Sequence, residues 1–321
     1  MALLETVLGA HLSPREKLYA LSLLSVAVIV ATLLLAFAAT FFAKAEPIFR
    51  KEGLGVYTWS VWLPSEDNPE AERYGLAAAI WGTVYVAIIA VAVSLPLSTA
   101  LALLVTEYIP SSKLREVVSA LSDAMAALPT IVYGLWGVTV LAPLLRDYVM
   151  EPLYECCRFI PLFSYEPTTG QSILTAGILM GIMSVPYVAS MIREAYLLIP
   201  RSLREAIYSL GATRAEATRL LLGYIKPVVI AAALLGFGRA AGETVAVSLV
   251  VGNTFTISIS PFAPGYTIAA LIANQYGNAY LYTYMESALF AGGLVLLLLG
   301  VVVNVIGITM MQRWLRNIHG K

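Results

Sequence analysis

Charged residues are scarce in this sequence, and their scarcity excludes an ordinary soluble domain. Lys, Arg, Asp and Glu make up 12 % of the 321 residues, whereas a soluble domain carries about 25 %. Hydrophobic residues supply 59 % of the chain, and its mean hydropathy is +0.80. The composition therefore indicates a polytopic membrane protein. The formal net charge is zero, so the charge balance does not indicate a nucleic acid as partner.

Cysteine and histidine are almost absent, which excludes most metal centres. The two cysteines are the neighbours Cys156 and Cys157, and the two histidines, His11 and His319, lie near the chain ends. These residues do not have the spacing of a metal site. A disulfide between neighbouring cysteines requires a strained ring. We therefore expect both cysteines to be free thiols or packing residues without a redox role.

A phosphate-binding loop is also missing. The pattern Gly-x4-Gly-Lys-Ser/Thr does not occur, and the only Gly-Lys pair is the final dipeptide. The chain therefore has no ATP site of this kind and is not expected to be an enzyme. If transport is driven by ATP, a separate ATPase must bind the ATP and Mg²⁺, and no cofactor is expected in this chain.

Six apolar segments are each long enough for a transmembrane helix, which needs about 20 residues. They cover about residues 18–42, 76–105, 117–145, 171–195, 228–252 and 284–312. The first segment is too long for the apolar part of a signal peptide, about 7 to 15 residues, and we expect it to be retained. The expected fold is an all-α membrane protein with one transmembrane domain over residues 1–321.

The distribution of basic residues predicts the orientation in a plasma or inner membrane. With both termini in the cytoplasm, the inner segments hold thirteen Lys and Arg residues and the outer segments hold six. The positive-inside rule therefore places both termini in the cytoplasm. The last outer segment, residues 253–282, has no charge but contains Pro261, Pro264, Gly265 and Gly277. We expect a re-entrant or interfacial element that the protein shields from lipid.

The fifth apolar segment, 228–252, contains Arg239 and Glu243. A charge at the centre of a membrane helix costs about 2.5 to 3.5 kcal/mol. The i, i+4 spacing allows the two side chains to face each other, and Gly238 with Gly242 would let another helix approach closely. A buried ion pair that only fixes packing is one interpretation. We favour a role in a solute pathway, because apolar residues often stabilise packing equally well. Arginine is suited to binding oxyanions.

The inner loop 199–227 predicts two short helices around a glycine turn. Ser202 with Glu205, and Thr213 with Glu216, have the spacing of a capping box, and Gly211 follows the first helix. An apolar stripe runs along the first helix, formed by Leu203, Ala206, Ile207 and Leu210. The stripe requires a partner surface, either the inner ends of this chain's own spans or another protein.

This loop resembles the EAA loop of ABC importer permeases, which docks into the ATPase subunit. Glu205, Ala206 and Gly211 match the pattern, whereas Ile207 replaces its second alanine and Tyr224 stands where the family usually has proline. The resemblance implies that the ATPase-docking residues are Leu203, Glu205, Ala206, Ile207, Leu210, Gly211 and Arg214.

The stretch GRAAGETVAVSLVVGN, residues 238–253, resembles the signature of phosphate ABC transporter permeases of the PstC type, and similarity runs over about residues 50–312. This resemblance implies a six-span, MetI-like type I importer fold. It implies a second permease (PstA type), an ATPase dimer (PstB type) and an extracytoplasmic binding protein (PstS type) that delivers inorganic phosphate. The implied pathway residues are Gly238, Arg239, Gly242, Glu243 and Thr244.

Three alternatives are weaker. Permeases for molybdate, tungstate or sulfate share the EAA loop but have no signature that we can match here. An ion-coupled secondary transporter or channel would give the capped inner loop no role. A membrane-embedded enzyme would need reactive side chains in the spans, and the chain has no cluster of His or Cys there. We further hypothesise that Glu243 distinguishes phosphate from sulfate, because protonated phosphate can donate a hydrogen bond to a carboxylate and sulfate cannot.

Overall fold

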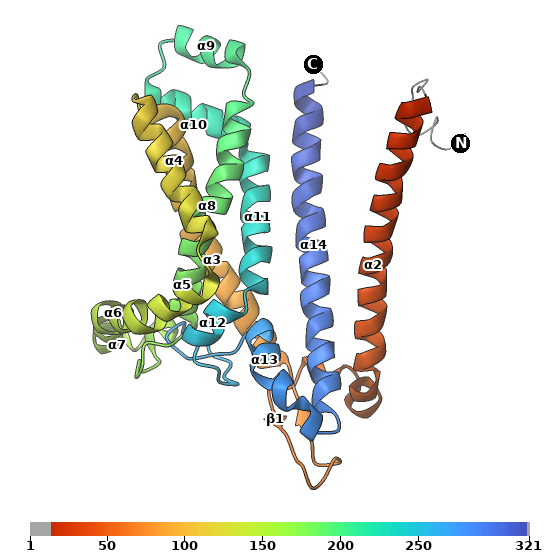
Figure 1. Ribbon diagram of the computed structural model, residues 1–321. Helices are drawn as coiled ribbons and strands as arrows, with labels where there is room; N and C mark the ends of the chain where they lie inside the picture. The colour runs from red at the N-terminus through yellow and green to blue at the C-terminus, as the bar shows by residue number, and fades with distance from the viewer. Residues whose placement is uncertain (1–13, 320–321) are drawn as a thin grey trace.

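The computed structural model describes residues 14–319, and long apolar helices dominate it (Figure 1). Four helices are long and apolar enough to cross a membrane: α2 (Pro14–Glu52), α3 (Ala77–Leu103), α8 (Ile173–Leu197) and α14 (Met285–His319). Two bent pairs raise the number to six: α4 (Ser112–Ala127) with the helical run Thr130–Cys157, and α10 (Arg214–Tyr224) with α11 (Lys226–Gly242). The expected all-α membrane fold is confirmed.

Shorter elements connect these helices. The run Thr130–Cys157 contains α5 (Thr130–Trp136), η3 (Gly137–Leu141), α6 (Ala142–Leu145), η4 (Arg146–Met150) and α7 (Glu151–Cys157). The other short elements are η1 (Gly53–Tyr57), β1 (Trp62–Leu63), β2 (Arg73–Tyr74), η2 (Leu104–Tyr108), η5 (Pro161–Phe163), α9 (Arg201–Ser209), α12 (Val245–Val250), α13 (Ile268–Gln275) and η6 (Tyr276–Leu281). β1 and β2 pair antiparallel with Trp62 opposite Tyr74. Elements η2, η3 and η4 are π-helical.

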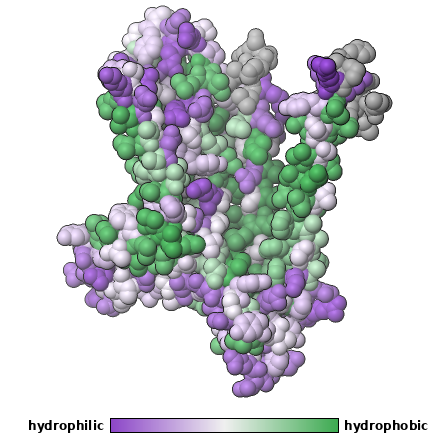
Figure 2. Space-filling model, in the orientation of Figure 1, coloured by the Kyte–Doolittle hydropathy of each residue, from purple (hydrophilic) through white to green (hydrophobic). Residues whose placement is uncertain are grey.

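The two ends of the molecule differ in content. Helices α9 and α10, the start of α2 and the end of α14 lie at one end, which we call the α9 end (Figure 1). Elements α6, α7, α12, α13 and β1 lie towards the opposite end, which we call the β1 end. Hydrophilic residues gather at both ends, and hydrophobic surface lies between them, most clearly along α2 (Figure 2). This distribution is typical of a protein whose middle faces lipid.

Close packing of α3 against α8 forms the centre of the molecule. A Cβ atom on Gly177 would lie 2.5 Å from the Cβ of Ile89, and one on Gly181 would lie 2.7 Å from the Cβ of Val93. The two glycines of α8 therefore let the branched side chains of α3 approach its backbone. The buried cluster around this contact continues into α11 and α12 and includes Val247 and other apolar residues.

A buried carboxylate ties the β1–β2 ribbon to the start of α14. The two oxygens of Glu72 accept hydrogen bonds from the backbone N–H groups of Thr283 (3.1 Å) and Tyr284 (3.0 Å). Lys51 donates to the Glu72 carbonyl at 2.9 Å. Burial raises the pKa of the Tyr74 phenol well above its ordinary value, and the nearby Glu72 carboxylate raises it further. The ribbon is therefore fixed to the helical body at this end.

The expected third span, 117–145, is not one straight helix. Its two helical parts, α4 and the run from Thr130, meet at an angle of 91°. The bend occurs at Leu128 and Pro129, where Leu128 is extended with ψ 135°. The proline ring disfavours the helical conformation of the residue before it, so the helix ends there. The second part continues beyond residue 145 to Cys157.

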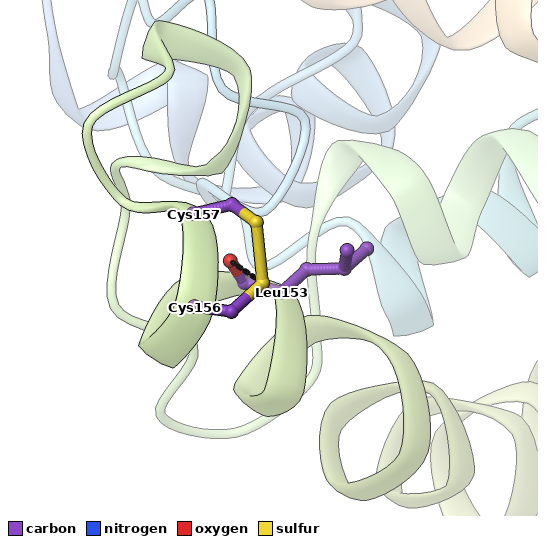
Figure 3. The surroundings of a disulfide bond; sticks show 3 residues. All are labelled: Leu153, Cys156 and Cys157. Atoms are coloured by element: carbon purple, nitrogen blue, oxygen red, sulfur yellow. Dashed lines mark hydrogen bonds between the residues drawn. A yellow bond between two sulfur atoms is a disulfide. The ribbon is translucent and has the colours of Figure 1, made fainter.

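The expectation of free thiols at Cys156 and Cys157 is wrong, because the structure joins them in a disulfide (Figure 3). Their Cα atoms lie 3.8 Å apart. The pair forms the last two residues of α7, and Cys156 is exposed. Packing constrains an exposed helix end only weakly, so this end can accommodate the small ring that we expected to be unfavourable.

The uncharged segment 253–282 is an irregular loop followed by α13 and η6, as expected. Gly252 and Gly265 form a parallel bridge at the base of the loop. Phe262, Ala263 and Tyr266 are buried. The side chains of α3 also hold the loop, since Trp81 donates to the Ser258 carbonyl at 3.0 Å. The protein therefore shields the part of the loop around Phe262 to Tyr266 as expected, whereas Ile257 and Ile259 are 51 % and 61 % exposed.

Candidate functional site

The expected fifth span, 228–252, is broken at its charged residues. Helix α11 ends at Gly242, and α12 begins at Val245. Glu243 has an extended backbone with ψ 132°, and its N–H bonds to the Ala240 carbonyl. The helical ladder therefore stops at this residue, and a continuous helix is not formed. We call Glu243 and Thr244, the two residues between α11 and α12, the break.

Arg239 lies on the exposed side of α11, one turn before the break. Its guanidinium carbon is 5.7 Å from the ring centre of Tyr187 on α8, and that tyrosine is 39 % exposed. The distance is within the range of a cation–π contact. Next to Arg239, Gly238 faces Val303, near the midpoint of α14. The arginine thus lies level with the middle of a long apolar helix.

The expected contact between Arg239 and Glu243 is absent from the structure. Within residues 14–319, no ion pair joins these two side chains. The i, i+4 geometry requires an unbroken helix, and the extended backbone of Glu243 removes it. Glu243 is half-buried, whereas Arg239 is exposed. Since a lone charge facing lipid is costly, both groups require water, a solute or another protein chain as neighbour.

The other predicted pathway residues surround the break but have different environments. A Cβ on Gly238 would contact Val303 of α14 at 3.6 Å, whereas a Cβ on Gly242 would meet nothing within 4 Å. The two glycines therefore do not form one ridge against a helix of this chain. The Thr244 hydroxyl donates to the Gly242 carbonyl at 3.4 Å. Gly242 thus borders open space directly beside the break.

Helix α12 is held by close packing on α5. A Cβ on Gly134 would lie 2.6 Å from the Leu249 side chain and 3.0 Å from the Cα of Ala246. Beyond α12, Asn253 has a positive φ of 52°, and its side-chain amide donates to the Ser248 carbonyl at 2.7 Å. The segment after the break is therefore held in a defined conformation by its contacts with α5 and by the Asn253 hydrogen bond.

The inner loop forms the two expected short helices, α9 and α10. The capping box of Thr213 and Glu216 is present, with each side chain bonded to the other's backbone N–H. The Thr213 N–H and the Thr213 hydroxyl both donate to the Glu216 carboxylate, at 2.8 and 2.7 Å, and these bonds lower the pKa of Glu216 below its ordinary value. Gly211 has φ +82°, the left-handed conformation that glycine adopts readily. The predicted box of Ser202 is wrong, because α9 begins two residues earlier than that box requires and Pro200 occupies the N-cap.

The predicted apolar stripe of α9 divides between two surroundings. Leu203 and Ile207 pack on the buried cluster at the α9 end of the molecule. Ala206 is exposed, and Leu210 is 88 % exposed. One half of the stripe therefore packs on this chain, as the first alternative predicts, and docking of the exposed half to another protein stays a prediction. Glu205, Gly211 and Arg214 are also exposed.

Two contacts at these sites have no clear signal in the sequence. Tyr187 follows Pro186 in an apolar span, and an aromatic residue there is ordinarily part of the core. Arg204 of α9 forms an ion pair with Glu107 of η2, although no local pattern links residues 97 positions apart. Across the described residues, no group of three or more His, Cys, Asp or Glu could hold a metal ion.

Comparison with known proteins identifies relatives over most of the chain. Residues 94–316 match the profile of a family described as "Binding-protein-dependent transport system inner membrane component". A "Probable phosphate transport system permease protein PstC" of Methanocaldococcus jannaschii is 50 % identical over 298 residues, 93 % of each chain. A "Phosphate transport system permease protein PstC" of Xylella fastidiosa is 38 % identical over 82 % of each chain.

A solved structure supports the fold. The match is to an inward-facing conformation of the MetNI methionine ABC transporter, with a TM-score of 0.53 and 20 % identity, covering 74 % of this chain and 95 % of that chain. At this identity the likeness shows the arrangement of helices alone. The expected MetI-like permease fold is confirmed.

Proposed function

This chain belongs to the binding-protein-dependent transport system inner membrane components, in their PstC type, and from this premise we propose that it is the membrane-spanning subunit of an ATP-driven phosphate importer. It is a multi-pass inner membrane protein that works with an ATPase and a binding protein, and it is not itself an enzyme. The observation that carries the proposal of phosphate is the 50 % identity to a PstC relative along 93 % of both chains.

The break supports a pathway role for its residues. Arg239 is exposed beside Tyr187, and Gly242 borders open space. A guanidinium presents parallel N–H donors that match two oxygens of an oxyanion such as phosphate. The open side of α11 at this level requires a polar neighbour, because a charge against lipid is costly. We infer that a PstA-type permease faces this side and that the two chains enclose the pathway between them.

The inner loop supports docking of a PstB-type ATPase dimer, which would bind the ATP and Mg²⁺. Helix α9 presents Glu205, Ala206 and the exposed Leu210, and Gly211 and Arg214 follow them. A groove on the ATPase would remove the apolar side chain of Leu210 from water, which is favourable. In this arrangement the α9 end lies in the cytoplasm, and the β1 end faces a PstS-type binding protein.

Uptake by reconstituted vesicles tests the function. The full transporter, with both permeases, the ATPase and the binding protein, is expected to accumulate phosphate only when ATP is supplied on the α9 side. Sulfate and molybdate serve as matched competitors. Uptake that persists without the ATPase would indicate an ion-coupled carrier, and preference for another oxyanion would refute phosphate as the substrate.

Two substitutions test the residues of the break. Arg239→Lys is expected to lower uptake at least about tenfold, because it loses the paired donors of a charge-assisted hydrogen bond worth about 1.5–3 kcal/mol. Arg158→Lys, an exposed arginine beyond α7, is the control with unchanged uptake. Glu243→Gln is expected to weaken the discrimination against sulfate. If phosphate uptake and sulfate exclusion both stay intact in Glu243→Gln, the role of Glu243 in selectivity is refuted.

A further inference from the structure

A half-buried ion pair fixes α9 to the end of α3. The guanidinium of Arg204 pairs with the carboxylate of Glu107 in η2, and their side chains are 28 % and 10 % exposed. The guanidinium carbon of Arg204 also lies 5.0 Å from the ring centre of Tyr196, a fully buried residue of α8. Because little water reaches the two charges, their attraction is screened less than that of a surface pair.

The residues around Glu107 join several helices at one corner. The carbonyl of Ile109 accepts a hydrogen bond of 2.9 Å from Arg115 of α4. The ring centre of Tyr108 lies 5.9 Å from the guanidinium carbon of Arg214 on α10. Residues 104–109, which we call the η2 corner, therefore contact α4, α9 and α10 as well as ending α3. The corner begins with a π-helical turn, a feature frequent at functional positions in helices.

A continuous packed route leads from the η2 corner to the break. Helix α4 leaves the corner and turns by 91° into the run that begins with α5. Gly134 of α5 packs directly on α12 at Ala246 and Leu249. Helix α12 begins immediately after Glu243 and Thr244. The first and last steps run along the chain, and the middle step is a close packing contact between α5 and α12, which transmits displacement because protein interiors have low compressibility.

We propose that Glu107 and Arg204 are positioning residues that transmit the movement of α9 to the membrane helices during transport. The proposal rests on the proposed function, in which α9 docks an ATPase. Leu203 and Ile207 also hold α9, but apolar contacts are non-directional and permit sliding. The ion pair has a preferred geometry. It therefore makes α9 and the η2 corner move together when the ATPase displaces α9.

Parallel measurement of transport and ATP hydrolysis tests this coupling. The complete transporter in vesicles is compared with Glu107→Gln, Arg204→Gln and the double variant. Each single variant is expected to retain ATP hydrolysis and to lower the number of phosphate ions taken up per ATP by about fivefold or more. The double variant should lose no more than either single variant, because the two residues act as a unit.

Two control variants distinguish loss of the Glu107–Arg204 ion pair from general damage to the transporter. Arg204→Lys keeps the charge and should restore most of the coupling. Lys44→Gln removes one partner of a more exposed pair with Glu286 at the β1 end, and normal coupling is expected. Unchanged phosphate uptake per ATP in both single variants would overturn the proposal. Loss of the ATPase from the purified complex would also overturn it, because the pair would then support docking rather than coupling.

The wild-type transporter distinguishes failure of this inference from failure of the proposed function. If the wild type shows no ATP-dependent phosphate uptake, the proposed function itself is wrong. If the wild type is coupled and the Glu107 and Arg204 variants are equally coupled, only the role of the ion pair is refuted.

Discussion

The guanidinium carbon of Arg239 lies 5.7 Å from the ring centre of Tyr187, and both side chains lie on the surface of the chain. The contact connects α11, directly before the break, with the middle of α8. A ring face beside a guanidinium restricts its orientation while leaving its N–H edge free for an anion. This relationship gives Tyr187 a role that its position in an apolar span did not suggest.

Removing the ring of Tyr187 should weaken transport moderately. Tyr187→Ala is expected to lower the phosphate uptake rate about two- to fivefold, since an exposed cation–π contact contributes about 0.5–1 kcal/mol. Tyr187→Phe keeps the ring and should match the wild type. The measurement is initial uptake by vesicles with equal amounts of assembled transporter. Equal loss in both variants would instead assign the role to the hydroxyl group.

The capping box of α10 should respond to acid. The pKa of Glu216 is lowered in the folded chain by hydrogen bonds from Thr213. Its contribution to stability is therefore present above the unfolded pKa, near the ordinary value of 4.5, and is lost as the pH falls through the lower folded value. Amide hydrogen exchange of α10 should be faster in Glu216→Ala than in the wild type at pH 7. The difference should shrink once the pH is well below 4.5.

A substitution of the uncharged partner in the same capping box provides the comparison with Glu216→Ala. Thr213→Ala removes the N-cap acceptor and should reduce the protection of α10 by about 0.5–2 kcal/mol. If the difference between Glu216→Ala and the wild type stays constant from pH 7 downward, the carboxylate does not stabilise the helix in its charged form.

The disulfide between Cys156 and Cys157 should control thiol labelling. A maleimide is expected to modify the purified wild-type protein only after reduction, and the exposed Cys156 should react first. The bond closes no long loop, so the chain-entropy argument predicts little stabilisation. The double variant Cys156→Ser, Cys157→Ser should therefore unfold within a few degrees of the wild type. Rapid labelling before reduction would contradict the disulfide.

Local signals in the sequence were sufficient to predict the structure where a few neighbouring residues determine it. The spacing of Thr213 and Glu216 predicted the cap of α10, and Gly211 predicted the turn before it. Ser202 and Glu205 have the same spacing, yet Pro200 takes the N-cap. Two competing starts only a residue or two apart cannot be separated by pattern alone.

Hydropathy located the membrane segments but not their interruptions. The run 228–252 is apolar enough to span, and nothing in a window average reveals that Glu243 is extended. Pro129 is a recognisable signal for the bend after Leu128, but a proline does not determine the angle. The pair of Glu107 and Arg204 depends on tertiary folding across 97 positions. Contacts of this kind require the three-dimensional structure.

The cost of two charges inside an apolar segment drew attention to Arg239 and Glu243, and a known signature then matched the same residues. The structure then changed their geometry, because the break separates side chains that an ideal helix would bring together. The site is thus better described as an exposed arginine followed by an interrupted helix than as an ion pair. Its exposure on one chain is consistent with a pathway completed by a second permease.

Solvent access beside the break in the assembled transporter shows whether Arg239 and Gly242 border a solute pathway. Gly242→Cys and Gly238→Cys form a matched pair on α11, placed in a background with Ser at positions 156 and 157. Both positions have room for the new side chain, but only Gly242 borders open space, whereas Gly238 faces Val303. A charged, water-soluble thiol reagent should label Gly242→Cys and block phosphate uptake, and it should leave Gly238→Cys unmodified. A Gly242→Cys that stays unlabelled in the working complex would show that the break lies in dry protein and would contradict the account.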